Sequence, residues 1–107
     1  MTYEIECYIE TIDSEGNFTF HGAEGYCLEK GDKTYNILWP DDNLKDDKSK
    51  ILVVFEQNEL NLKVNLSKQQ RMFQLLLNAK VNRQKVIMTV DYETPEKITS
   101  VIKVTIK

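Results

Sequence analysis

The chain is poor in the residues that carry out chemistry at neutral pH. Its 107 residues include one histidine, two cysteines and one tryptophan, and they contain no glycine-rich phosphate loop. A nucleophilic cysteine needs a nearby base and a group that orients the base, and His21 is the one histidine in the sequence. The spacing of His21, Cys7 and Cys27 matches no zinc signature. We therefore expect no enzyme activity, no metal and no cofactor.

Long apolar runs are missing as well. No stretch approaches the roughly 18 apolar residues that span a bilayer, so we expect no membrane partner. The opening residues, MTYEIECYIE, lack the basic start and apolar stretch of a secretion signal. We expect a cytoplasmic protein, or a periplasmic or secreted one if a signal was removed. Cys7 and Cys27 are accordingly either free thiols in a reducing cell or one disulfide formed after export.

The net charge of −3 is unevenly distributed along the chain. Residues 1–47 carry twelve acids and three bases, whereas residues 48–107 carry five acids and eleven bases. Such polarity indicates head-to-tail association or an electrostatically chosen partner, unless folding mixes the two halves. The acid pairs Asp41–Asp42 and Asp46–Asp47 lack the glycine and terminal glutamate of a calcium loop, so a solvated loop is expected there.

Most of the sequence alternates with the period of two that is typical of strands. In the first strand Tyr3, Ile5, Cys7 and Ile9 fall on one face. The segment ILVVF, residues 51–55, is apolar on both faces and predicts the most buried strand. We expect a mainly β fold with one α-helix: a single OB-like domain over residues 1–107, built as a five- or six-stranded antiparallel barrel with the helix before the last hairpin. A roll or sandwich with a helix laid on it is the alternative.

The segment FQLLLNAKVNRQKV, residues 73–86, predicts that helix. Ser67 followed by Gln70 fits a capping box at its start, and the helix is expected to end near Asn82. On a helical wheel one apolar stripe faces the core; it contains Met72, Leu75, Leu76 and Ala79.

A second apolar stripe on the same helix contains Phe73, Leu77 and Val81. One barrel cannot cover both stripes, and exposed apolar helix faces mark interaction surfaces. We expect the second stripe to pack against another copy of the chain, which makes the protein a homo-oligomer. The alternative is that residues 40–50 fold over Phe73 and Leu77.

Residues 64–104 resemble the small OB-fold B-subunit-like proteins related to the subtilase-cytotoxin pentamer. The resemblance implies that the helix lies at an assembly interface around a ring axis and that an outer face binds glycans. No sugar-binding residue can be matched position by position, and a signal peptide is missing. The residues that carry the likeness are Ser67, Phe73, Leu75–Leu77, Asn82–Lys85 and Ile98–Val101.

Three functions follow as hypotheses. The first is a non-catalytic binding module that self-associates through its helix and engages another protein or a glycan. The second is a cytoplasmic inhibitor or adaptor, of phage or mobile-element type, whose acidic face docks on a basic protein. The third, single-stranded nucleic-acid binding, is disfavoured because no aromatic platform alternates among the bases. The expected partner contacts are Glu4, Glu6, Glu10, Tyr8, Tyr26, Tyr35, Trp39, Asp41 and Asp42. For Tyr35 and Trp39 the alternative is ordinary core packing, which is favoured for Trp39.

Overall fold

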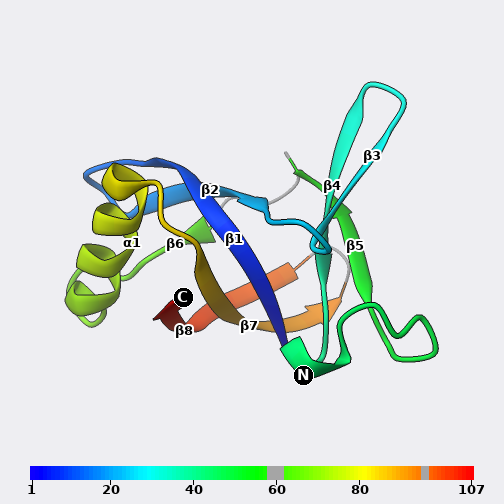
Figure 1. The fold of residues 1–107 in the computed structure, drawn as a ribbon. Helices are drawn as coiled ribbons and strands as arrows, with labels where there is room; N and C mark the ends of the chain where they lie inside the picture. The colour runs from blue at the N-terminus through cyan, green and yellow to red at the C-terminus, as the bar shows by residue number, and fades with distance from the viewer. Residues whose placement is uncertain (58–61, 95–96) are drawn as a thin grey trace.

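The computed structural model describes residues 1–57, 62–94 and 97–107, and its strands form two antiparallel sheets (Figure 1). The larger sheet has the strand order β6-β2-β1-β7-β8, and the smaller has the order β3-β4-β5. The strands are β1 (Thr2–Ile12), β2 (Asn17–Gly22), β3 (Cys27–Lys30), β4 (Lys33–Leu38), β5 (Val53–Glu56), β6 (Leu62–Lys63), β7 (Val86–Thr94) and β8 (Lys97–Ile106). The helix α1 covers Gln70–Asn82, and a short 3-10 helix, η1, covers Asp42–Leu44.

The expected fold class is confirmed: the described chain is mainly β, with one α-helix before the last hairpin. The five-stranded sheet curls into a half-barrel, and β8 approaches β6 as a barrel requires (Figure 1). The described residues form eight strands rather than five or six, because β3, β4 and β5 build a separate sheet beside the half-barrel.

The first strand follows the predicted alternation. Tyr3, Ile5, Cys7 and Ile9 are all buried in β1, and the neighbouring strand β2 adds the buried rings of Phe18 and Phe20. A half-buried strand places alternate side chains on the core face, so these residues form the centre of the half-barrel.

The prediction that residues 51–55 form the most buried strand is wrong. Ile51 is 60% exposed and Val54 is 42% exposed, whereas Phe55 is buried. The reason is that β5 begins only at Val53, so Ile51 precedes the strand, and that β5 is an edge strand of the smaller sheet, which packs one face on the core. An apolar residue on its other face is left in solvent.

The helix α1 packs against β1 and β8. Leu76 and Ala79 are buried there, as expected. Leu75 was expected in the same stripe but is exposed, whereas Phe73 packs against the core. The core-facing side is therefore rotated toward Phe73. No helix among the described residues is long and apolar enough to cross a bilayer.

The start of the helix differs from the predicted capping box. The N-cap residue is Gln69, and its side chain makes no capping bond. The Asn65 side chain instead accepts hydrogen bonds from the backbone N–H groups of Ser67 and Lys68, at 3.1 and 3.3 Å. Asparagine side chains stabilise such turns because they reach their own backbone a few residues on. The helix ends at Asn82, as predicted.

The two sheets meet at Glu4 and Trp39. The backbone N–H of Glu4 donates to the carbonyl of Trp39 at 2.7 Å, and the N–H of Trp39 donates to the carbonyl of Glu4 at 3.0 Å. Nearby, the backbone N–H of Gly22 donates to the buried Asn36 side chain at 2.8 Å. These bonds fix the smaller sheet on the half-barrel, and they bring several polar side chains together at the junction.

Candidate functional site

The junction between the sheets gathers some of the acids that were predicted as partner contacts. The Glu4 carboxylate accepts a hydrogen bond from the backbone N–H of Asp42 at 2.8 Å. The Tyr26 hydroxyl donates to the Asp42 carboxylate. These two bonds hold η1 against the core, so Glu4 and Asp42 are engaged inside the molecule.

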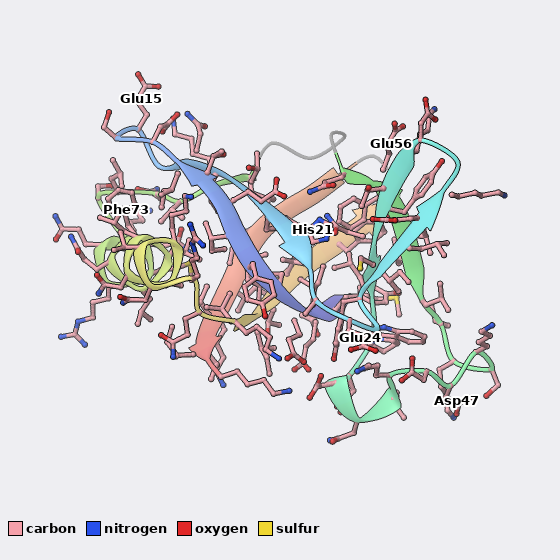
Figure 2. The ribbon with its side chains drawn as sticks, turned by 45° about the horizontal axis from the view of Figure 1, so that its top comes forward. Glu15, His21, Glu24, Asp47, Glu56 and Phe73 are labelled. Atoms are coloured by element: carbon pink, nitrogen blue, oxygen red, sulfur yellow. The ribbon has the colours of Figure 1, made fainter. Side chains whose placement is uncertain are left out.

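The loop of residues 40–50 lies at the opposite end of the molecule from α1. Figure 2 labels Asp47 on this loop and Phe73 on the helix, at opposite ends of the molecule. The alternative in which this loop folds over Phe73 and Leu77 is therefore wrong. The Asp47 carboxylate accepts bonds from the backbone N–H and hydroxyl of Ser49, and these bonds lower the pKa of Asp47.

Glu6 was predicted to contact a partner on an acidic face, but its side chain is buried. The Lys107 ammonium donates to one of its oxygens at 2.9 Å, and the Lys85 ammonium lies 3.6 Å from the other. The hydrogen bond to Glu6 raises the pKa of Lys107. A buried carboxylate must be paired in this way because an isolated buried charge is strongly unfavourable. Glu6 therefore serves the fold rather than an exposed acidic face.

The expectation that Tyr26 is an exposed aromatic contact is wrong, because Tyr26 is buried. Trp39 is buried as well, as its core-packing alternative predicts. Burial, together with the hydrogen bond to Asp42, raises the pKa of the Tyr26 hydroxyl. The Lys45 ammonium lies 5.3 Å from the centre of the Tyr26 ring. The indole N–H of Trp39 donates to the carbonyl of Gly25 at 3.1 Å. Both aromatic residues thus hold the junction together.

The remaining predicted contacts do not form one surface. Tyr8 and Glu10 are exposed on β1, Asp41 is exposed before η1, and Tyr35 is half-buried on β4. The structure thus brings Glu4, Glu6, Tyr26, Trp39 and Asp42 together at the junction, with Asp41 next to Asp42, and leaves Tyr8, Glu10 and Tyr35 apart.

The sequence did not predict a small polar cluster that Glu10, His21 and Gln57 form. The Gln57 amide N–H donates to the Glu10 carboxylate at 3.0 Å and lies 3.1 Å from Nδ1 of His21. His21 Nδ1 lies 3.8 Å from the same carboxylate, and Figure 2 shows His21 beside the smaller sheet. Gln57 lies 36 positions from His21, so no local spacing signals this cluster.

The outward-facing side of the smaller sheet, which we call the outer face, carries a group of apolar side chains bordered by Lys30, Lys33 and Glu56. Leu28 pairs with Tyr35 and Ile37 pairs with Val54 across the strands, and paired residues lie on the same side of a sheet. Leu28 is 47% exposed, and Tyr35 and Ile37 are half-buried. Leu28, Ile37 and Val54, with Leu52, line a shallow hollow of about 450 Å³. The alternation of Tyr35 and Ile37 is a signal in the sequence that could have indicated this face.

The three residues of the predicted helix interface, Phe73, Leu77 and Val81, differ in exposure because α1 turns Phe73 toward the core. Phe73 packs against the core and Leu77 is half-buried, whereas Val81 is 72% exposed. The three side chains therefore do not form one exposed stripe, although their role in self-association stays a prediction.

Metal-ligating side chains do not cluster in the described part of the chain. Within residues 1–57, 62–94 and 97–107, no three histidine, cysteine or acidic side chains are grouped closely enough to hold a metal ion. Cys7 and Cys27 are both free, Cys7 in the core and Cys27 half-buried.

Comparisons with known proteins do not assign these surfaces to a family. No protein-family model, curated protein or solved structure matches the chain. The resemblance to B-subunit-like proteins of the subtilase-cytotoxin type, with its ring assembly and glycan binding, stays a prediction. Part of the segment that carries it, Pro95 and Glu96 with the side chains of residues 93–99, lies outside the described residues.

Proposed function

We propose that this chain is a non-catalytic binding module that contacts another protein through the outer face of its smaller sheet. The observation that carries the proposal is the exposed apolar pair Leu28 and Val54, aligned by strand pairing with Tyr35 and Ile37. Contiguous apolar surface on a small domain is typical of interaction sites. A rim of charge surrounds it, including the Lys33–Glu56 ion pair at 3.8 Å.

The geometry favours a partner protein with an apolar surface over the basic protein of the inhibitor hypothesis. Of the acids proposed for that docking, Glu4 accepts from the backbone N–H of Asp42, the Asp42 carboxylate accepts from the Tyr26 hydroxyl, and Glu6 is paired with two lysines. Breaking these bonds on docking would leave polar groups unpaired, which is costly. An apolar partner surface, in contrast, needs no rearrangement of the outer face.

Site-specific photo-crosslinking tests the proposal. Tyr35→p-benzoylphenylalanine places a photoreactive ring on the outer face, and Tyr8→p-benzoylphenylalanine places the same group on β1, away from it. We expect position 35 to yield a discrete crosslinked protein in the source cells, and Leu28→Lys to abolish that product. Equal crosslinking at both positions, or a product that is insensitive to Leu28→Lys, would contradict the proposal.

A further inference from the structure

The two sheets have four edge strands, which differ in how well they are protected from pairing with a further strand. In the larger sheet β6 is two residues long and lies against β8. The carbonyl of Val101 on β8 accepts a hydrogen bond from the Gln69 side chain at 3.1 Å. In the smaller sheet β3 ends in the charged pair Glu29 and Lys30. Short length, charge and capping are the means by which proteins block unwanted strand pairing.

The edge of β5 is as short as that of β3, but between Val53 and Phe55 it carries no charged residue. Its sequence, Val53–Val54–Phe55, is apolar, with two β-branched valines and one aromatic ring, and lacks lysine and proline. Within the described residues its single strand partner is β4, and Figure 1 shows no strand on its other side. Such a segment on an open edge pairs readily with another strand.

The hydrogen-bonding pattern shows which backbone groups this edge presents. The N–H of Ile37 donates to the carbonyl of Tyr26 at 2.8 Å, which is on the side of β4 away from β5. In an antiparallel ladder the N–H and C=O of one residue point to the same neighbour, and opposite residues share this pattern. Because Ile37 is opposite Val54, the N–H and C=O of Val54 point outward, away from β4. The N–H of Glu56 points the same way because its opposite residue is Tyr35.

We propose that β5 pairs with β5 of a second copy of this chain, antiparallel about a two-fold axis at Val54. This pairing joins the two smaller sheets into one continuous sheet. At the axis the N–H and C=O of Val54 meet those of Val54 in the second copy. In the same register the N–H of Glu56 faces the carbonyl of Leu52 in the second copy.

A second copy fits this edge because the register is self-complementary. Val53 lies opposite Phe55 of the second copy, so apolar side chains meet on the inner side. Glu56 lies opposite Leu52 rather than another carboxylate, and like charges opposite one another would be unfavourable. On the outer side the two Val54 side chains meet and extend the outer face across the axis. Two-fold pairing of identical surfaces is also the commonest form of oligomer.

Sedimentation equilibrium tests the dimer with two substitutions at one position. Val54→Pro removes an outward N–H but no bond to β4, so the fold is retained while both copies lose a donor. We expect it to weaken dimerisation by more than about tenfold. Val54→Thr keeps the N–H and the β-branched shape, and we expect its dimerisation to remain within a few-fold of the wild type.

Amide hydrogen exchange on the unaltered protein gives a second test. The N–H of Val54 is expected to exchange slowly at high protein concentration and rapidly on dilution, whereas the N–H of Phe55, directed at β4, stays protected at both. A monomer at every concentration, with Val54 always exchanging rapidly, would overturn the proposal. So would a dimer that Leu77→Glu dissociates and Val54→Pro leaves intact, because the interface would then be the helix.

This dimer does not depend on the binding function proposed above. Leu28→Lys is expected to abolish the crosslink from position 35 and to leave the β5 dimer intact, because Leu28 lies on β3, at the far edge of its sheet. The two proposals can therefore fail separately.

Discussion

The hydroxyl of Tyr26 donates a hydrogen bond to the carboxylate of Asp42, sixteen positions further along the chain. Tyr26 is fully buried, whereas Asp42 lies half-buried at the start of η1. The bond therefore connects the core to the polar loop of residues 40–50. Since the Glu4 carboxylate accepts from the Asp42 N–H, the same aspartate is also held by β1.

Tyr26→Phe is expected to loosen this loop while it preserves the core. The ring remains, but Asp42 loses a charge-assisted hydrogen bond, which lowers the free energy of unfolding by about 1–2 kcal/mol. Urea denaturation measures the loss, and hydrogen exchange is expected to quicken at residues 42–45. Asp42→Asn serves as the control. Its amide oxygen can still accept from the Tyr26 hydroxyl, so we expect a smaller decrease in the free energy of unfolding. Unchanged stability in Tyr26→Phe would show that the bond contributes nothing.

Alkaline pH is expected to destabilise the fold through the same tyrosine. Burial and the Asp42 carboxylate raise the pKa of Tyr26 in the folded state. The folded protein therefore holds this proton more tightly than the unfolded chain, whose tyrosines ionise near pH 10. Stability is fully present below that value and falls as pH rises above it. Denaturation series at rising pH are expected to show a shallower decline in Tyr26→Phe than in the wild type.

Arg83→Gly is expected to stabilise the protein. Arg83 follows the last residue of α1 and has a φ of 51°, a left-handed conformation that favours glycine over any side chain with a Cβ. Removing the Cβ is expected to raise the free energy of unfolding by about 0.5–1 kcal/mol. Arg83→Ala is the matched control, because it removes the same side chain but keeps the strain. A melting temperature that rises equally in both variants would rule out the backbone explanation.

The two thiols are expected to react at different rates with a disulfide reagent. Cys7 is buried, and burial raises its pKa far above the usual range for cysteine. The pKa of the half-buried Cys27 is raised as well, by burial and then by Glu29 and Glu24. Because the thiolate is the reactive form, Cys27 is expected to react slowly in the native state and Cys7 on unfolding. Cys27→Ser then leaves no thiol that reacts in the native protein; a rapid native reaction in that variant would contradict the burial of Cys7.

Local patterns in the sequence were sufficient for the fold class and for several elements. The alternation of Tyr3, Ile5, Cys7 and Ile9 predicted a half-buried strand because strand periodicity is a property of adjacent residues. The single helix and its end near Asn82 followed from similarly local signals.

Contacts between distant residues were beyond such patterns. Glu6 resembled a solvent-facing acid on an alternating strand, yet its partner Lys107 lies 101 positions away. The segment at residues 51–55 was apolar enough to predict burial. Its pattern does not say whether these side chains are buried inside the folded chain or against another chain. The outer face was missed for the same reason, since Leu28, Ile37 and Val54 come from three separate strands.

The bridge between Glu4 and Trp39 gives the protein a built-in optical reporter. Trp39 is the one tryptophan in the chain, and it is buried where the smaller sheet is hydrogen-bonded to β1. Its fluorescence therefore records whether the two sheets are docked: a shift of the emission to longer wavelength, while the far-ultraviolet signal of the strands persists, would show the smaller sheet detaching before the half-barrel unfolds.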